Sequence, residues 1–257
     1  MPQAGGMDQL KPTTYQNRCI GITGASGTLG GALTRSFRAS GAEVVGLTHS
    51  SPPQIKDDEG PHRWISWQCG DESALDGDLA QLDVLVLNHG INPKGGQSLE
   101  DVNRALEINA LSSWRLLQRY EEISRCKARD TPMEIWINTS EAEIQPAVSH
   151  VYDISKRLLG ELVSLRGATR PAAERQRLVI RKLVLGPFRS DLNPIGIMNA
   201  NWVANQVLNQ ASWGLRLIIV TPNPLTYLLM PITELGRRIY SQLLNRRDRK
   251  GFRNHHW

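Results

Sequence analysis

The sequence has few cysteines and no long apolar run, and both absences narrow the class of protein. Its three cysteines, Cys19, Cys69 and Cys126, are widely spaced and form no CxxC pair, so neither a disulfide framework nor a zinc site is indicated. No apolar run reaches the roughly 18 residues typical of a membrane-spanning helix, and we expect no such helix. These features are typical of a cytoplasmic protein with reduced thiols.

Both ends of the chain differ in composition from its middle. Residues 1–15 are rich in glycine, proline and polar side chains and lack the apolar stretch of a signal peptide, which predicts a disordered leader. Part of the net charge of +5 comes from the other end, where seven Arg or Lys residues between Arg237 and Arg253 accompany one acid, Asp248. Such a tail can meet nucleic acid or anionic lipid, or remain a solvated terminus. Because no nucleic-acid recognition motif accompanies it, we expect no nucleic-acid partner.

Between these ends, short apolar runs alternate with segments of helical periodicity, and 257 residues suit a single α/β core. The alternation predicts right-handed βαβ units, and therefore a doubly wound Rossmann-type fold over residues 16–222, with helices on both faces of a parallel sheet. The predicted strands are 18–23, 43–47, 64–68, 84–88, 134–138, 178–185 and 215–221. The predicted helices are 29–40, 99–119, 152–165 and 200–210.

The last segment, 223–257, follows a different pattern. Apolar residues recur at helical spacing, and arginines largely occupy the other faces. The apolar residues are Ile232, Leu235, Ile239, Leu243 and Leu244, and the arginines are Arg237, Arg238, Arg246 and Arg247. Such a helix can pack on the domain, pack on a second subunit, or lie in a membrane interface as a peripheral contact. We expect residues 225–231, LTYLLMP, to be an exposed segment that precedes this helix.

A glycine-rich turn follows the first predicted strand and opens a helix. In this GxxGxxG run, Gly24 permits a tight turn, Gly27 lets the backbone approach a pyrophosphate, and Gly30 allows close helix–strand packing. The helix N-terminus supplies N–H donors and the positive end of its dipole to the phosphates. The position of the run at the first strand-to-helix junction predicts a dinucleotide site. Its predicted contacts are Gly24, Ser26, Gly27, Thr28, Leu29 and Gly30.

The end of the second predicted strand carries no carboxylate. An NAD enzyme usually places an acid there to bind the ribose hydroxyls. Here Thr48, His49 and Ser50 occupy the position, and the next acid is Asp57. Neutral side chains do not repel a 2′-phosphate, so the sequence favours NADP(H) over NAD(H).

Tyr152 and Lys156 lie four residues apart and therefore share one face of a helix. An ammonium beside a phenol favours the phenolate and lowers its pKa, which suits proton transfer to and from a carbonyl or alcohol oxygen. Ser140, at the end of the fifth predicted strand, is placed to hydrogen-bond a developing alkoxide. These residues predict general acid/base chemistry with Tyr152 as the acid or base.

In these elements, over about residues 18–222, the chain resembles the short-chain dehydrogenase/reductase family. The segments NTSEAE (138–143) and GPF (186–188) resemble a cyanobacterial branch of that family. The resembling elements are the turn 23–30, Asn88-His89-Gly90, Asn109, Ser140, the pair Tyr152 and Lys156, and the stretch 185–190. The resemblance implies that Lys156 also holds the nicotinamide ribose and that Asn109 supports a proton-relay water. It further implies cofactor contacts from Asn88, His89, Gly90, Tyr152, Lys156, Gly186, Pro187 and Ser190. A homodimer or homotetramer through helices 99–119 and 152–165 is expected on the same ground.

The chain departs from the family pattern at several positions. Ser140 precedes Tyr152 by twelve residues where the family commonly has thirteen, so Thr139 competes with Ser140 as the catalytic hydroxyl, and we prefer Ser140. Glu141 and Glu143 are expected near the mouth of the substrate site. The segment 71–83 is short for a full connecting helix. His89 replaces a small residue, and we interpret it as a packing or hydrogen-bonding substitution, with no role as a base.

Together these features predict an NADP(H)-dependent oxidoreductase that interconverts a carbonyl and an alcohol. The loop after Ser190 is apolar and is expected to close over a hydrophobic substrate. Its apolar residues are Leu192, Pro194, Ile195, Ile197, Met198 and Trp202. The alternative is a non-catalytic dinucleotide-binding regulator or scaffold on the same fold, since a fold does not dictate a function. The complete set of Ser140, Tyr152 and Lys156 argues against that alternative.

Overall fold

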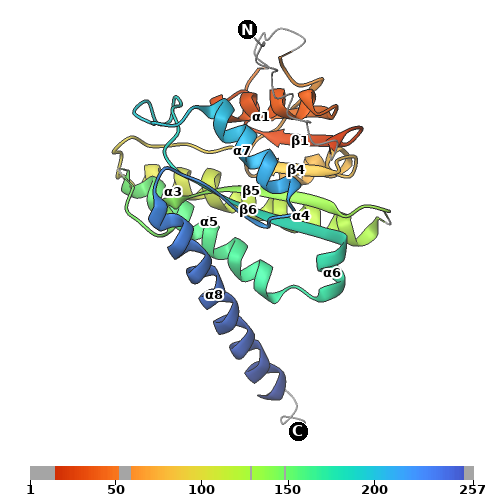
Figure 1. The fold of residues 1–257 in the computed structure, drawn as a ribbon, viewed down its shortest axis with the longest axis vertical. Coiled ribbons are helices and arrows are strands. Elements are labelled where there is room, and N and C mark those ends of the chain that lie inside the picture. The colour runs from red at the N-terminus through yellow and green to blue at the C-terminus, as the bar shows by residue number, and fades with distance from the viewer. Residues whose placement is uncertain (1–14, 52–58, 128, 148, 252–257) are drawn as a thin grey trace, which may run out of the picture.

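The computed structural model describes residues 15–51, 59–127, 129–147 and 149–251. Seven strands form one parallel sheet in the order β3-β2-β1-β4-β5-β6-β7, and helices lie on both of its faces (Figure 1). The strands are β1 Cys19–Thr23, β2 Glu43–Thr48, β3 Arg63–Ser66, β4 Val84–Leu87, β5 Met133–Ser140, β6 Leu178–Leu185 and β7 Leu217–Val220. The predicted doubly wound Rossmann-type fold is confirmed.

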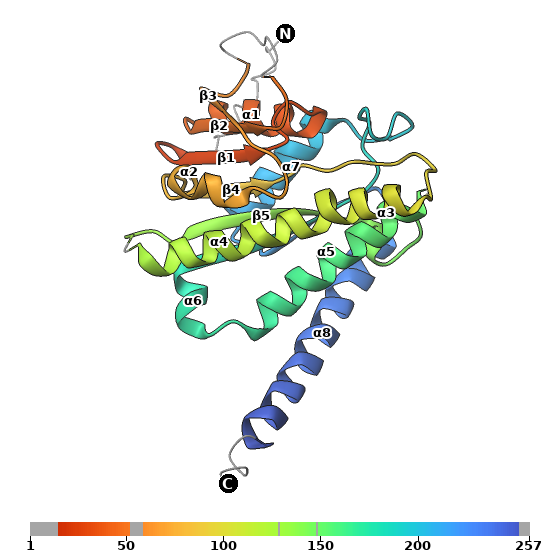
Figure 2. The same cartoon turned by 180° about the vertical axis from the view of Figure 1, so that it is seen from behind.

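Two layers of helices cover the sheet. α1 and α7 lie over one face, and α4 and α5 lie over the other, as the two opposite views in Figures 1 and 2 show. The helices are α1 Thr28–Ala39, α2 Asp76–Leu79, α3 Leu99–Leu106, α4 Ser112–Cys126, α5 His150–Thr169, α6 Ala172–Arg177, α7 Ala200–Ser212 and α8 Pro224–Gly251. Short helical turns occupy Glu72–Leu75, Glu107–Leu111 and Glu141–Glu143.

The core consists of one apolar layer on each face of the sheet. Along β4, Val84 and Val86 join the layer under α1 and α7, and Leu85 and Leu87 join the layer under α4 and α5. This alternation is the two-residue period of a strand that is buried on both faces. Side-chain burial on both sides therefore fixes the register of the sheet.

An aromatic cluster fills the layer beneath α1. Tyr15, Phe37 and Trp136 are fully buried, and their ring centroids lie 5.2–5.7 Å apart. The predicted disordered leader ends too late, because Tyr15, its last residue, belongs to this core. The remaining leader residues, 1–14, lie outside the described residues.

Two helical predictions differ from the structure. The predicted helix 99–119 is divided by a π-helical turn, Glu107–Leu111, between α3 and α4, and it continues to Cys126. The sequence prediction also missed α6, a six-residue helix between α5 and β6 with no buried residue to give it an apolar period. The expectation of a short connection at 71–83 is confirmed, because only a 3-10 turn and the four-residue α2 lie there.

The last helix starts earlier than predicted. The segment 225–231 is part of α8 and does not precede it, with Pro231 inside the helix. α8 begins at Pro224, and Asn223 caps it: the Asn223 side-chain oxygen accepts the N–H of Leu225 at 3.0 Å. An Asn cap followed by proline is a common helix start, so the sequence does contain the signal. α8 runs along α5 (Figure 2), whereas the side chains of residues 243–257, including Leu243, Leu244, Arg246, Arg247, Asp248 and Arg253, lie outside the described part.

The aromatic cluster gives a stability prediction. Replacing Phe37 with alanine (Phe37→Ala) removes a fully buried ring and leaves a cavity against Tyr15 and Trp136, so we expect a loss of about 3–5 kcal/mol in the free energy of unfolding. Leu99→Ala, at a side chain that is 76% exposed, should change it by less than about 0.5 kcal/mol. Urea denaturation measures both, and equal effects of the two substitutions would contradict the assigned core.

Candidate active site

The predicted site residues meet at one edge of the sheet. Because β1, β4, β5 and β6 are parallel, their carboxyl ends lie on the same side, and these ends carry Thr23, Asn88, Ser140 and Gly186. Ligands in open α/β sheets bind outside this edge. The structure therefore brings together residues that are more than 160 positions apart in the sequence.

The glycine turn has the geometry that a pyrophosphate requires. Gly24 has φ +64°, a backbone conformation that suits glycine, and a Cβ on Gly30 would overlap the Gly24 carbonyl oxygen. Gly27 caps α1 without a side-chain hydrogen bond to the first turn, so no side chain takes the place of an anion there. Ser26, Gly27 and Thr28 are exposed. The turn fits a dinucleotide phosphate, with backbone N–H groups as the donors.

Leu29 takes a different place from the other predicted contacts of the turn. Its side chain is buried in the layer beneath α1 and α7, so only its backbone can approach a phosphate. At the end of β2, Thr48 is buried and its hydroxyl lies 3.2 Å from that of Ser50, whereas His49 and Ser50 are exposed. Asp57, the next acid, lies outside the described residues.

Thr23 ties the ends of β1 and β4 together. Its hydroxyl oxygen accepts the N–H groups of Asn88 at 2.9 Å and His89 at 3.2 Å, and lies 2.8 Å from His89 Nδ1. The other imidazole nitrogen lies 3.5 Å from the Ser113 hydroxyl. The interpretation of His89 as a hydrogen-bonding substitution is thus confirmed. Burial, together with the Lys156 charge, lowers the pKa of His89 to about 3, so the imidazole is neutral at physiological pH.

Asn109 is a structural clamp between the strand end and α5. Its side-chain oxygen accepts the N–H of Ile91 at 2.7 Å, and its amide donates to the Ile91 carbonyl and the Ser155 hydroxyl, both at 2.9 Å. It lies in the π-helical turn and is fully buried. A Cβ on Gly90 would lie 3.0 Å from its oxygen and 3.8 Å from Lys156 Nζ. Asn109 therefore fixes the backbone after Gly90 beside the Tyr152–Lys156 helix.

Ser140, Tyr152 and Lys156 form the polar centre of the site. The Lys156 ammonium lies 5.9 Å from the centroid of the Tyr152 ring and donates to the Asn138 carbonyl at 3.1 Å. The Asn138 amide in turn donates to the Asn88 side chain at 3.0 Å. Lys156 thus bridges α5 and the end of β5.

The pKa of Tyr152 moves in the opposite direction to the sequence-based expectation. Burial raises it to about 12, and interaction with the Ser140 hydroxyl lowers it only in part. Burial also lowers the pKa of Lys156 to about 8, although the Glu143 charge raises it. The prediction of a lowered Tyr152 pKa is wrong for this structure, because desolvation outweighs the interactions that favour the phenolate.

The geometry distinguishes between the two candidate hydroxyls. Thr139 is buried, and its hydroxyl donates to the Leu183 carbonyl at 3.1 Å across the sheet. Ser140, the next residue, points to the opposite side, interacts with Tyr152 and accepts the N–H of Ala142 at 3.2 Å. This arrangement favours Ser140 over Thr139.

Two of the predicted site residues, Thr28 and Ser190, line a cleft of about 620 Å³ between the glycine turn and the loop after β6. Met198 lines it as well, whereas Ser140, Tyr152 and Lys156 are not among its lining residues. Gly186 lies so close to Thr221 that a Cβ would overlap the threonine hydroxyl, and the Pro187 carbonyl accepts the N–H groups of the loop at Ile197 and Met198. The loop therefore folds back toward the glycine turn.

The expectation that Glu143 lies at the mouth of the site is wrong. Glu143 is buried and paired with Lys182 at 2.6 Å and with Arg237 at 3.1 Å, and these cations compensate the burial of its carboxylate. Glu141 is half-buried and accepts a hydrogen bond from the Thr221 hydroxyl, and its place at the mouth stays a prediction.

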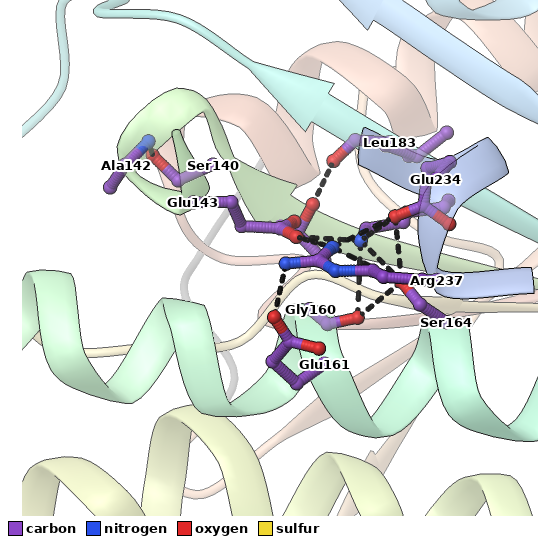
Figure 3. A network of polar contacts seen from close by, with 11 residues as sticks. Ser140, Ala142, Glu143, Gly160, Glu161, Ser164, Leu183, Glu234 and Arg237 are labelled. Carbon is purple, nitrogen blue, oxygen red and sulfur yellow. Dashed lines mark hydrogen bonds and ion pairs between the residues drawn. The ribbon is translucent and has the colours of Figure 1, made fainter. Parts of the chain in front are cut away.

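Lys182 is the centre of a buried charge network that sequence reasoning missed. Its ammonium contacts the carboxylates of Glu143 and Glu234, and it donates to the Ser164 hydroxyl at 2.9 Å. Arg237 pairs with both carboxylates as well (Figure 3). The network joins β6, α5 and α8 to the turn that follows Ser140. The only sequence signal is a lysine inside an otherwise apolar half-strand, KLVL.

The strand order, the glycine turn and the Ser140, Tyr152 and Lys156 cluster define a class: a dinucleotide-binding protein with the short-chain dehydrogenase fold. The profile of the NAD dependent epimerase/dehydratase family matches residues 20–163, and the chain belongs to this family. The matched family is one of NAD-dependent epimerases and dehydratases.

A relative of this chain comes from a cyanobacterium, in agreement with the predicted cyanobacterial branch. The monoglucosyldiacylglycerol epimerase of Synechocystis sp. is 38% identical over 238 residues, which are 91% of this chain and 57% of that protein. The chain thus spans little more than half the length of this relative.

Solved structures support the fold. The aldohexose dehydrogenase of Thermoplasma acidophilum has a TM-score of 0.66 at 17% identity, with 81% of this chain and 94% of that chain covered. A short-chain dehydrogenase from Sphingobium yanoikuyae in complex with NADPH has a TM-score of 0.71 at 15% identity, with 88% and 95% covered.

The buried imidazole predicts a pH effect on stability. The pKa of His89 is about 3 in the folded protein and near 6.5 in the unfolded chain, so below pH 6.5 only the unfolded state gains a proton and stability falls. Between pH 7 and pH 5, wild type should lose about 2 kcal/mol more unfolding free energy than His89→Gln. Urea denaturation at both pH values measures the difference, and parallel losses would show that His89 titrates normally.

Breaking the charge network should destabilise the fold. Lys182→Met leaves Glu143 and Glu234 with Arg237 as their shared cation, and we expect a loss of about 3 kcal/mol. Lys94→Met, the same exchange at an exposed position, should change stability by less than about 0.5 kcal/mol. Thermal and urea unfolding compare the two, and an unchanged Lys182→Met midpoint would refute a structural role for the network.

Proposed function

We propose that the chain is an NAD(P)-dependent enzyme that interconverts an alcohol and a carbonyl at one carbon, and that it uses this step to epimerise a sugar hydroxyl of a glycolipid. The observation that carries the redox step is the cluster of Ser140, Tyr152 and Lys156 beside the glycine turn. The epimerase assignment and the glycolipid substrate rest on the 38% identity with monoglucosyldiacylglycerol epimerase.

The proposed reaction is balanced without an external oxidant. In the oxidation half, the hydride leaves the carbinol carbon and the hydroxyl proton passes to the phenolate form of Tyr152, which gives a ketone. The hydride then returns to the opposite face of the carbonyl carbon and Tyr152 returns the proton to its oxygen, which gives the epimer. When bound, the nicotinamide supplies the hydride acceptor and donor. The net change is inversion at one carbon, and no reducing equivalent is consumed.

The protein residues supply the proton and the orientation. With a pKa of about 12, Tyr152 keeps its proton at neutral pH and is suited to donate it to the forming alkoxide as the ketone is reduced. Ser140 hydrogen-bonds the same oxygen. Lys156, with a pKa of about 8, remains largely charged at pH 7 and stabilises the phenolate when the proton has left.

The proposed cofactor is NADP(H) in preference to NAD(H). Thr48, His49 and Ser50 present no carboxylate at the end of β2, and the exposed His49 and Ser50 can accommodate a 2′-phosphate. The sequence-based preference therefore stands as a proposal.

A lipid substrate agrees with the loop after Ser190. Leu192, Ile195, Ile197 and Trp202 are exposed, at 41–77% of their accessible surface, beside the cleft. Exposed apolar side chains around a site of this kind suit a ligand with an apolar portion. The hydrophobic substrate expected from the sequence is thus proposed as a glycolipid, with the sugar beside Ser140 and Tyr152.

The reaction can be tested with far less cofactor than substrate. Monoglucosyldiacylglycerol in detergent micelles, incubated with substoichiometric NADP⁺ or NAD⁺, should be converted to its epimer over many turnovers per cofactor. Tyr152→Phe should lower kcat by at least about 100-fold because it removes the transferable proton. Ser73→Ala, which removes an exposed hydroxyl in the turn Glu72–Leu75, should retain wild-type kcat.

The alternatives give different products. A ketone that accumulates with one equivalent of reduced cofactor identifies a net oxidoreductase. Cofactor binding without turnover of this glycolipid or of a panel of apolar alcohols and ketones supports the regulator or scaffold. Equal kcat in Tyr152→Phe and wild type contradicts the assigned proton donor.

A further inference from the structure

α8 has its polar face turned inward and its apolar face turned outward. The side that packs on the domain carries Thr226, Met230, Glu234 and Arg237, of which only Met230 is apolar. An ordinary surface helix has the reverse arrangement, with the apolar stripe against the core. The outward face of α8 therefore needs an apolar partner outside the domain.

The orientation of α8 is fixed by buried charges. Glu234 and Arg237 belong to the Lys182 network, and Arg237 also pairs with Glu161 of α5 (Figure 3). Rotation of α8 to bury its apolar side would expose Lys182 and leave Glu143 without Arg237. Loss of a buried ion pair is costly, so the network holds the apolar face outward.

The outward stripe is continuous along the described part of the helix. At 3.6 residues per turn its members lie on one side, over about 22 Å of helix length. They are between 43% and 66% exposed, and none of them makes up part of a buried core cluster. The stripe comprises Leu225, Leu228, Leu229, Ile232, Leu235, Ile239 and Tyr240.

Charge indicates what covers the stripe. Arg237 is neutralised by the Lys182 network, but the segment from Arg238 to Arg253 carries six further basic residues and one acid, which complements an anionic lipid surface. A second copy of the chain would bring the same excess of positive charge to the contact. In the described part of the chain, no helix is both long enough and apolar enough to pass through a bilayer, so the geometry is that of a helix in the interface plane.

The start of α8 adjoins the candidate active site. Asn223 donates to Gln145 at 2.7 Å, and the Thr226 hydroxyl contacts Glu141 at 3.4 Å, so the first turn packs against the segment that follows Ser140. Docking of the stripe on a membrane would therefore place the edge of the site next to the lipid headgroups.

We propose that the outward face of α8 docks the protein on an anionic lipid surface, with the stripe from Leu225 to Tyr240 in the headgroup–acyl boundary. Docking requires neither cofactor nor turnover, so it goes beyond the proposed function and can fail or succeed independently of it.

Vesicle co-sedimentation with the full chain tests the proposal. Wild type should bind vesicles of phosphatidylglycerol and phosphatidylcholine more tightly than vesicles of phosphatidylcholine alone, and added salt should weaken the binding. The double variant Ile232→Glu/Leu235→Glu should partition at least about tenfold more weakly, because two carboxylates enter the apolar stripe. Its thermal unfolding midpoint should remain near that of wild type, since both side chains are exposed.

A charge-matched variant distinguishes the effect of the α8 stripe on vesicle binding from the effect of a lower net charge. Gln68→Glu/Gln176→Glu adds the same two carboxylates at exposed positions away from α8 and should bind vesicles within about twofold of wild type. Equal weakening of both double variants would overturn the assigned face and leave only a charge effect. Absence of vesicle binding, with a wild-type dimer that Ile232→Glu/Leu235→Glu dissociates, would overturn it in favour of a second copy of the chain.

Discussion

The parallel direction of all seven strands is the constraint on which the rest of the structure depends. It places the carboxyl ends of β1, β4, β5 and β6 on one edge, where a glycine turn, Asn88, Ser140 and Gly186 meet. Apolar layers on both faces hold these strands in register, because a shift of one residue would exchange the side chains between two layers that pack against different helices. Packing in the core therefore determines the positions of the site residues at the strand ends.

α5 connects this edge to the remainder of the molecule. Near its start it presents Tyr152 and Lys156 to the strand ends, and Ser155 between them is held by the buried Asn109. Its later turns face the Lys182 network and, through it, α8. α5 is also one of the two helices predicted to form a dimer contact, and α8 already packs against it. The oligomeric state stays a prediction. The placement of α5 therefore determines both the position of Tyr152 and Lys156 and the orientation of α8.

Much of this could be predicted from the sequence, because the signals are local. Strand 178–185 matches β6 residue for residue, and Gly24 and Gly30 have the backbone roles that their spacing indicates. The pKa of Tyr152 could not be predicted, since it depends on burial by segments distant in the chain. The same holds for Glu143, whose partners Lys182 and Arg237 come from β6 and α8 and leave no periodic pattern.

We propose that the β1–α1 turn binds the phosphates of a nicotinamide dinucleotide, and substitutions at Gly27 test this proposal. Gly27 has φ −79° and an extended backbone, and an added Cβ meets only the Gly24 carbonyl oxygen, at 3.3 Å, so Gly27→Asp should fold and cap α1 well. In fluorescence titrations with NADPH and NADH, wild type should bind well below millimolar, NADPH more tightly. Gly27→Asp, whose carboxylate occupies the anion site, should bind at least about 100-fold more weakly, about 2.7 kcal/mol. The neutral cap Gly27→Ser should retain most of the affinity. Equal binding by wild type and Gly27→Asp, or no binding by wild type, would contradict the account.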